Sequence, residues 1–214
     1  MNVYHGRPAQ MTGRSEREQK VYDFLDLLGI DYERADHEAA ATIEACKEID
    51  QALGVSMCKN LFLCNRRKTE YYLLILPGEK PLRTKELSAQ IPTTRLSFAS
   101  GEDMEEYLHV TPGSATVLAL LFDTDQKVKL LVDEELLRED YIGCHPCVNT
   151  SSLKIQSEDL FGRILKVLNR DFIVVHLSGG EADGEKNDGV KTDSEETNRS
   201  AESEEKITKE EMLL

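Results

Sequence analysis

Two short apolar runs separated by a polar turn constrain the fold of this chain more than any other feature. The runs are Asn60–Cys64 and Tyr71–Leu76, and the turn between them begins with the sequence Asn-Arg-Arg-Lys. Runs of this length around such a turn are typical of two antiparallel strands joined as a β-hairpin. Pro77 and Gly78 end the second run, so the chain is expected to continue into another element.

Short amphipathic segments surround this hairpin, and their spacing predicts helices. Ser15 and Glu18 form a capping box, and apolar residues then recur at helical spacing until Gly29 ends the pattern. The same reasoning predicts further helices at Thr42–Leu53, Thr84–Gln90, Gly101–Leu108, Glu134–Glu139 and Ser157–Leu168, the last of them capped by Ser157.

The remaining apolar segments predict strands. Ala115–Phe122 is continuously apolar, as expected for a strand buried on both faces, and Val128–Val132 is its predicted partner. Further strands are predicted at Arg95–Phe98, Cys147–Ile155 and Phe172–Leu177. This interspersed order predicts an α/β domain of the mixed α+β kind, with a central mixed, largely antiparallel sheet flanked by helices.

The composition changes after Leu177. Residues 178–214 are rich in Gly, Ser, Glu and Asp and carry twelve acidic against five basic residues. Such a segment buries too little apolar surface to offset chain entropy. We therefore expect a flexible N-terminus at residues 1–14, a folded domain at residues 15–177 and a disordered acidic tail at residues 178–214.

The net charge and the hydropathy of the chain limit which binding partners we expect. The chain carries a net charge of −14, which argues against DNA binding and against any broad binding of nucleic acid through phosphate neutralisation. No apolar run approaches the ~20 residues that span a bilayer. The first residues also lack the apolar stretch of a secretory signal, so we expect a cytoplasmic protein without a membrane partner. A small basic rim around a pocket remains compatible with this charge, although each member can equally be a solvated loop charge: Arg66, Arg67, Lys68, Lys80, Arg83, Lys85 and Arg95.

Cys144 and Cys147 form a Cys-x-x-Cys pair, which can bind a metal or exchange disulfides. Zinc usually needs four ligands, and a redox pair is expected at the start of a helix, whereas this pair leads into a strand-like segment. Plain structural thiols are therefore favoured over a thiol or zinc protein, and we predict no metal and no cofactor.

Three other segments contain candidate catalytic or ligand-binding residues. Lys59 with Asn60 begins an apolar strand, where a lysine can reach a phosphate or polarise a carbonyl, or simply lie at an edge in water. The turn at Gly113 and Ser114 can leave backbone N–H groups facing a ligand oxygen, or can be a simple turn.

The third place is His145 with Asn149 and Thr150. Next to a proline-fixed turn, His145 can hydrogen-bond a ligand or act as an acid or base near neutral pH. It can equally hold its own loop through a backbone hydrogen bond. Neither a phosphate-binding Gly-x-x-x-x-Gly-Lys loop nor a Gly-x-Ser-x-Gly elbow occurs in the sequence, which excludes two common hydrolase designs.

Taken together, these motifs resemble the YbaK/ProX superfamily of aminoacyl-tRNA deacylases. More narrowly, the chain is similar to freestanding relatives of the editing domain inserted in bacterial prolyl-tRNA synthetase, over roughly Glu16 to Leu177. The motifs that carry the resemblance occur in the order Asp36-His37-Glu38, Ala41-Thr42, Lys59-Asn60-Leu61-Phe62-Leu63, Pro112-Gly113-Ser114 and Gly143-Cys144-His145-Pro146-Cys147-Val148-Asn149-Thr150.

The resemblance implies a YbaK/ProX-type fold and a function. The activity would be trans-editing, which is hydrolysis of the ester that joins a wrong amino acid to the terminal adenosine of a tRNA. Relatives with this pattern are associated with alanine on proline tRNA, and sister groups clear cysteine, serine or threonine. The implied partners are the aminoacylated acceptor end of proline tRNA and, further, prolyl-tRNA synthetase.

The resemblance also implies residue roles. Lys59 would anchor the tRNA end, the backbone of Gly113 and Ser114 would hold the carbonyl or the attacking water, and His145 would shape the pocket. No side chain is an obvious general base, and a ribose hydroxyl of the substrate would assist. The predicted catalytic residues are Lys59, Gly113 and His145, and the predicted substrate-binding residues are Thr42, Asn60, Ser114, Asn149 and Thr150.

One departure keeps an alternative open. Where many relatives continue the glycine turn as Ser-x-Ser-Pro-Phe-Gly, residues 114–119 read Ser-Ala-Thr-Val-Leu-Ala. The amino-acid preference is therefore not determined, and a catalytically weak module that binds tRNA or the synthetase is the alternative to an active hydrolase.

Overall fold

The computed structural model describes residues 1–39 and 43–179. Its strands are β1 Val3–His5, β2 Tyr32–Asp36, β3 Cys58–Asn65, β4 Tyr71–Pro77, β5 Leu96–Phe98, β6 Val128–Asp133, β7 Tyr141–Cys144, β8 Ser151–Gln156 and β9 Phe172–Val175. Its α-helices are α1 Glu16–Leu27, α2 Ile43–Leu53, α3 Thr84–Gln90, α4 Gly101–Leu108 and α5 Leu165–Val167. Two 3-10 helices, η1 Val117–Leu121 and η2 Glu134–Arg138, and the π-helix η3 Asp159–Ile164 complete the described elements.

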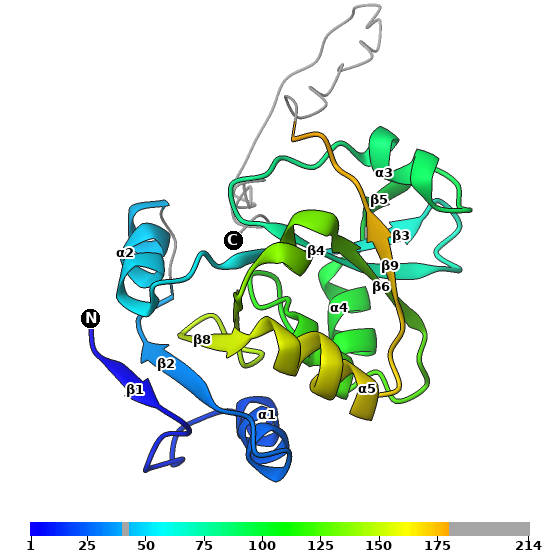
Figure 1. Ribbon diagram of the computed structural model, residues 1–214. Helices are drawn as coiled ribbons and strands as arrows, with labels where there is room; N and C mark the ends of the chain where they lie inside the picture. The colour runs from blue at the N-terminus through cyan, green and yellow to red at the C-terminus, as the bar shows by residue number, and fades with distance from the viewer. Residues whose placement is uncertain (40–42, 180–214) are drawn as a thin grey trace, which may run out of the picture.

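The strands form two sheets, where the sequence led us to expect one central sheet. The first, sheet A, is antiparallel with the order β1-β2-β8-β7. The second, sheet B, has the order β5-β3-β4-β6-β9 and is mixed, because β6 runs parallel to both β4 and β9. Figure 1 shows β1, β2 and α1 on one side of the molecule and sheet B with α3 on the other. The mixed α/β class is confirmed, and the predicted hairpin is the β3–β4 pair of sheet B.

The two sheets meet where β7 lies against the start of β3. Met57 and Gly143 form a parallel bridge there. A Cβ atom on Gly143 would lie 2.8 Å from the carbonyl oxygen of Ser56 and 2.9 Å from the Cα of Met57, so only glycine allows the two backbones to approach this closely. The junction ties the beginning of β3 to the loop after β7, two segments that the motif analysis had singled out.

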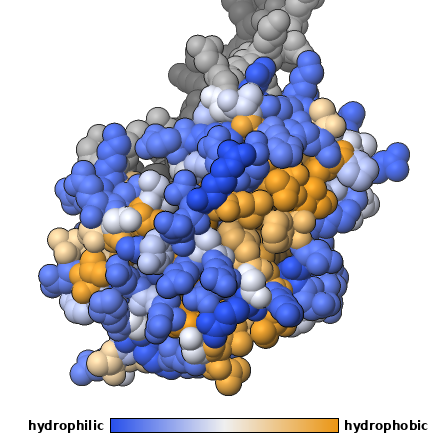
Figure 2. Space-filling model, in the orientation of Figure 1, coloured by the Kyte–Doolittle hydropathy of each residue, from blue (hydrophilic) through white to orange (hydrophobic). Residues whose placement is uncertain are grey.

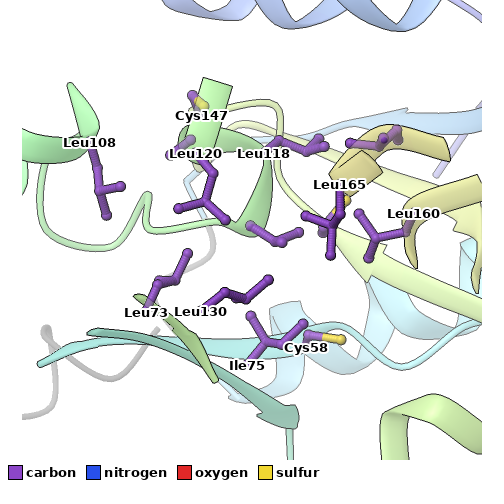
Figure 3. Packing of buried hydrophobic residues seen from close by; sticks show 14 of the residues in the cluster. Cys58, Leu73, Ile75, Leu108, Leu118, Leu120, Leu130, Cys147, Leu160 and Leu165 are labelled. Carbon is purple, nitrogen blue, oxygen red and sulfur yellow. The ribbon is translucent and has the colours of Figure 1, made fainter. Parts of the chain in front are cut away.

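The segment Ala115–Phe122 is not a strand, and that prediction is wrong. Its residues form η1, which Thr116 caps by accepting a hydrogen bond from the Leu118 N–H at 3.4 Å. The neighbours of β6 in sheet B are β4 and β9, so this apolar run has no strand position to fill. Its middle residues, Val117–Leu120, are buried in the core instead, and Figure 3 shows Leu118 and Leu120 opposite the side chains of sheet B.

Other differences concern sheet A. The predicted strand Cys147–Ile155 begins only at Ser151, and the preceding residues form the loop between β7 and β8. Strands β1, β2 and β7 were not predicted, because they are short and only partly alternating. The N-terminal segment that we expected to be flexible thus contributes Val3–His5, which pair with β2.

The predicted cap of the last helix also differs. The Ser157 hydroxyl is buried and caps no N–H, and its oxygen has no hydrogen-bond partner among the described residues. The helix that follows is a π-helix continued by α5. The predicted acidic tail lies outside the described residues, except for Ser178 and Gly179.

Within residues 1–39 and 43–179, no helix is both long enough and apolar enough to span a bilayer. Figure 2 shows mostly hydrophilic residues, with an apolar stretch over β9. Ile173 and Val174 of this edge strand are 41% and 39% exposed.

Candidate active site

Lys59 lies near the start of β3, half-buried on the face of sheet B that α3 covers. It alternates with Leu61 and Leu63, which belong to the small core cluster on that face. Its Nζ donates a hydrogen bond of 3.2 Å to the backbone carbonyl of Lys80. Burial lowers the pKa of Lys59, while Glu79 acts in the opposite direction. Within the described ranges no carboxylate lies within ion-pair distance of this ammonium group, so its charge is available to a ligand.

Asn60 faces the opposite side of sheet B, with Cys58 and Phe62. Its Nδ2 donates to the carbonyl of Cys58 at 3.0 Å. Its Oδ1 is buried and has no hydrogen-bond partner in the described part of the chain. The two neighbouring residues of the Lys-Asn motif therefore serve different faces, and Asn60 offers an acceptor that the surrounding residues leave unsatisfied.

His145 follows directly after β7, at the junction of the two sheets. The parallel bridge of Met57 and Gly143 precedes Lys59 by two residues on one segment and precedes His145 by two residues on the other, so both residues follow the same junction. The Nδ1 of His145 donates to the carbonyl of Ser151 at 3.1 Å, so the neutral ring presents the lone pair of Nε2. Burial lowers the pKa of His145, which keeps the ring neutral near pH 7.

His37 approaches the same place from the end of β2. Its Nδ1 donates to the carbonyl of Glu38 at 2.7 Å, and its Nε2 accepts from the Ser152 hydroxyl at 2.9 Å. Ser152 is fully buried, and its oxygen lies 3.5 Å from the Nδ1 of His145. The proximity of His37 further lowers the pKa of His145. Two histidines distant in sequence thus converge on one buried hydroxyl.

The glycine turn precedes η1. Gly113 has a φ of +81°, which strains any residue with a side chain. The N–H of Ser114 is engaged within the turn, because it donates to the carbonyl of Thr111 at 3.0 Å. Of the two backbone N–H groups that the sequence suggested for a ligand oxygen, that of Gly113 is the one without a partner among the described residues.

Asn149 and Thr150 lie in the loop between β7 and β8. The Thr150 carbonyl accepts a hydrogen bond of 3.0 Å from the His37 N–H, so this predicted substrate-binding residue joins the loop to the end of β2. Asn149 is partly exposed beside it. Thr42, the remaining predicted substrate-binding residue, lies outside the described residues.

The cysteine pair is part of the core. Cys144 and Cys147 are buried with free thiols, and Figure 3 shows Cys147 next to Leu118 and Leu120 of η1. Burial raises the pKa of both thiols. Reactive cysteines are exposed and have lowered pKa values, so these two have the environment of structural thiols. No group of three or more metal-binding side chains occurs among the described residues.

Two hollows on the surface lie elsewhere. One, of about 430 Å³, includes Phe161, Arg170 and Phe172, and the other, of about 640 Å³, includes Tyr32 and Lys154. None of the predicted site residues lines either hollow. The candidate site is thus identified by its polar groups at the sheet junction and not by these cavities.

Sequence reasoning missed three residues of this neighbourhood: His37, Lys80 and Ser152. His37 belongs to the family motif Asp36-His37-Glu38 but was given no role. Its place in that motif was the signal that could have identified it as a site residue. Lys80 was counted in a basic rim around a pocket, or as a solvated loop charge, yet it is 8% exposed and its Nζ lies 2.9 Å from Asp133 and 3.0 Å from Glu135. Its burial follows from a pairing across more than fifty residues, which no local pattern reveals.

Comparison with known proteins supports the family that the sequence motifs resemble. The family model described as the aminoacyl-tRNA editing domain matches residues 37–162, more than half of the chain. The prolyl-tRNA editing protein ProX of Acetoanaerobium sticklandii is 30% identical over 162 residues, which cover 76% of this chain and 98% of that protein. The prolyl-tRNA synthetase associated domain-containing protein 1 of Mus musculus is 30% identical over 168 residues, covering 77% and 96%.

A solved structure agrees in fold. It is described as a candidate trans-editing enzyme for prolyl tRNA synthetase, and it matches with a TM-score of 0.58 at 17% identity over 76% of this chain and 97% of that one. These matches confirm the resemblance and the enzyme class that the motifs predicted. The chain belongs to the aminoacyl-tRNA editing domain family.

Proposed function

We propose that this chain hydrolyses the ester of mischarged tRNA in trans, with alanine on proline tRNA as its substrate. Two relatives that align with nearly their full length support this substrate, since their names refer to prolyl-tRNA editing and to prolyl-tRNA synthetase. The partners are then the acceptor end of proline tRNA and prolyl-tRNA synthetase, and the place of action is the cytoplasm, where both occur.

The observation that carries the proposal is that Lys59 and His145 each follow the sheet junction of Met57 and Gly143 by two residues. Lys59 supplies a half-buried ammonium group without a carboxylate partner among the described residues. His145 supplies a neutral ring whose Nε2 has no hydrogen-bond partner among the described residues. A cation in a partly desolvated position attracts an anion more strongly than one in water, because the local dielectric constant is lower.

These groups match what ester hydrolysis requires. Water adds to the carbonyl carbon, the negative charge develops on the carbonyl oxygen, and the bond to the ribose oxygen breaks as that oxygen takes a proton. In this proposal Lys59 anchors the terminal phosphate, and the Gly113 N–H, which precedes η1 on the other face of sheet B, is the expected donor to the developing oxyanion. The Nε2 of His145 accepts a hydrogen bond from a hydroxyl of the terminal ribose and so orients the ester. The side chains thus position the substrate, and its own hydroxyl assists the proton transfer.

The choice of amino acid rests on exclusion by size. A small pocket admits alanine and rejects the larger proline ring by steric clash, whereas the reverse selection is much harder. Residues 117–119, which depart from the pattern of the relatives, are buried in η1 next to the glycine turn. Their packing supports the turn that holds Gly113.

A deacylation panel tests the proposal. Proline tRNA carrying labelled alanine or proline is incubated with the protein, beside tRNAs carrying serine, cysteine or threonine, and release of the amino acid is followed. We expect alanine to be released with multiple turnovers and proline to be retained. Lys59→Ala should lower kcat/KM by about 10²–10³-fold, as for other lost transition-state contacts. Lys166→Ala, an exposed lysine on α5, serves as the matched control and should retain activity.

Two outcomes would contradict the proposal. Absence of release from every charged tRNA would exclude a deacylase. Tight binding of the tRNA end without hydrolysis would instead support the alternative function, a binding module that kept the fold and lost turnover.

A further inference from the structure

Three arginines gather at the end of sheet B that is remote from Lys59. Arg66 and Arg67 form the tip of the β3–β4 turn, and Arg95 directly precedes β5. The last paired residues of β3 and β5 are Asn65 and Leu96, so one further step in this antiparallel register places Arg66 beside Arg95. Figure 1 shows this turn and the loop into β5 at the edge of the molecule away from α1 and β1. We call these three exposed residues the arginine cluster.

The loops that carry the cluster are held in place. The Asn65 side chain accepts from the Thr69 N–H at 2.9 Å and donates to the Thr69 hydroxyl at 3.0 Å, which fixes the turn. Glu70, at the end of the turn, accepts from the Thr93 hydroxyl at 3.0 Å and so ties the loop of Arg95 to the same turn. The cluster is therefore preorganised, which reduces the entropy lost when a ligand binds.

The nearby carboxylates are already engaged by other groups. Glu70 also forms an ion pair with Lys129 at 2.6 Å. Asp103 accepts from Lys68 at 2.8 Å and from the Tyr71 hydroxyl at 3.0 Å. In the described part of the chain, none of the three arginines has an ion-pair partner.

This arrangement is unusual for an acidic protein. Like charges opposite each other at a sheet edge destabilise the pair, and the cost is relieved when an anion binds between them. Arginine guanidinium groups match phosphate oxygens in geometry and can donate two hydrogen bonds at once. The unbalanced cluster therefore fits a ligand that carries phosphates.

The distance between Lys59 and the arginine cluster indicates which phosphates of a bound tRNA can reach the cluster. Arg66 lies seven residues after Lys59 along β3, which corresponds to about 23 Å at ~3.3 Å per residue. A stacked nucleic-acid strand advances ~3.4 Å per phosphate, so about seven nucleotides span this separation. With the terminal adenosine at Lys59, the cluster meets the backbone of the acceptor stem.

We propose that the arginine cluster docks the phosphate backbone of the tRNA acceptor stem while the aminoacylated end occupies the site of Lys59. This inference rests on the proposed function. To the contact of Lys59 with the tRNA end, it adds a second contact between the arginine cluster and the acceptor stem. It predicts that the cluster contributes to substrate binding and not to the chemical step.

The test compares two substrates and two double variants. The substrates are full-length proline tRNA charged with alanine and a short single-stranded oligonucleotide that ends in the same alanyl-CCA. Arg66→Gln with Arg95→Gln removes two charges from the cluster. Lys47→Gln with Lys166→Gln is the matched control, since both lysines are exposed and without an ion-pair partner in the described ranges. Urea denaturation of each variant shows whether folding is unchanged.

For the cluster variant we expect the KM for full-length tRNA to rise by about tenfold or more, with kcat unchanged. The slope of log KM against log salt should fall by about 1.8, which is ~0.9 for each lost phosphate contact. The KM for the oligonucleotide should stay the same, and the control variant should behave like the original protein with both substrates.

An equal KM for tRNA in the cluster and control variants would overturn the proposal, as would an equal loss with both substrates. A KM below that of the original protein would also overturn it. Failure of the proposed function is distinguishable, because the original protein would then hydrolyse neither substrate. In that case, fluorescence anisotropy with uncharged tRNA tests the cluster directly, and equal affinity of the two variants would refute it.

Discussion

The Nζ of Lys59 donates a hydrogen bond to the backbone carbonyl of Lys80, and the two lysines have opposite electrostatic environments. Burial lowers the pKa of Lys59. Burial opposes the charge of Lys80 as well, but hydrogen bonds to Asp133 and Glu135 outweigh it and raise the pKa. One lysine is thus an available cation, and the other is a fixed structural ion that holds the turn to which the first is bound.

Lys80→Met should strongly destabilise the protein. Asp133 is fully buried, and loss of its partner leaves a buried carboxylate uncompensated, at a cost of about 3–5 kcal/mol. Lys80→Met with Asp133→Asn removes both charges and keeps an acceptor for the Glu135 N–H, so it should regain most of this loss. Free energies of unfolding from urea titrations provide the comparison.

The same double variant shows whether Lys80 only stabilises the structure or also takes part in the reaction. Because Lys59 contacts the backbone of Lys80 and not its side chain, the refolded double variant should keep kcat within a few-fold of the original. A loss as large as that of Lys59→Ala would mean that the charge of Lys80 takes part in the reaction.

The activity should fall at acid pH through His145. Burial and the neighbouring His37 lower its pKa below the ordinary value of 6.5. The ring is therefore neutral near pH 7, and kcat/KM should decline only as the pH approaches the lowered value. His37→Gln removes one cause of the shift, so the acid limb should move to higher pH. Profiles of kcat/KM at and below neutral pH, where spontaneous ester hydrolysis is slow, measure the displacement.

Stability should follow the same titration. Between the lowered pKa of His145 and 6.5, the unfolded chain binds more protons at this residue than the folded one. The contribution of His145 to the free energy of unfolding is then fully present above 6.5 and is lost as the pH falls toward the lowered value. In a His145→Gln variant, this part of the pH dependence should be absent from urea titrations. An unchanged dependence would show that other groups cause it.

Gly143→Ala should damage the sheet junction. The added Cβ would lie 2.8 Å from the Ser56 carbonyl oxygen, and the β3 and β7 backbones would have to move apart at a cost of about 1–3 kcal/mol. Because this contact joins the segments that carry Lys59 and His145, kcat/KM should fall by more than the stability change explains. Gly162→Ala is the control, since its nearest neighbour lies at 4.0 Å and the helical position favours alanine. Equal activity of the two variants would refute the role of the junction.

Replacement of the cysteine pair should leave the reaction intact. Cys144→Ala with Cys147→Ala removes two buried thiols whose pKa values are raised. We expect lower stability, because small cavities form beside η1, but an unchanged kcat per folded molecule. The original protein can also be treated with an alkylating reagent. Loss of its activity on alkylation of the thiols would contradict this expectation.

The elements that local chemistry defines were predicted well. The helices Thr84–Gln90 and Gly101–Leu108 have the predicted bounds, because local apolar spacing specifies both and the Ser100–Asp103 capping box also fixes the start of the second. The hairpin β3–β4 was also predicted, since its turn and both strands are adjacent in sequence. The family motifs, which are strings of neighbouring residues, led to the correct family and enzyme class.

The elements that depend on distant neighbours were not predicted. The run Ala115–Phe122 was assigned as a strand because continuous apolarity fits any buried element, and only the positions of β4 and β9 around β6 exclude it. The site roles of Lys59, Asn60 and His145 remain predictions.

The sequence by itself determined the family, the hairpin and the capped helices, because each depends on residues close together in the chain. Only the tertiary structure decided that the strands divide into two sheets and that Gly143 brings the loop of His145 to the start of β3. It also decided that Lys59 and Asn60 face opposite sides and that Lys80 is a buried ion. The physical reason is that burial and pairing depend on contacts between segments far apart in sequence, which no local pattern of residues records.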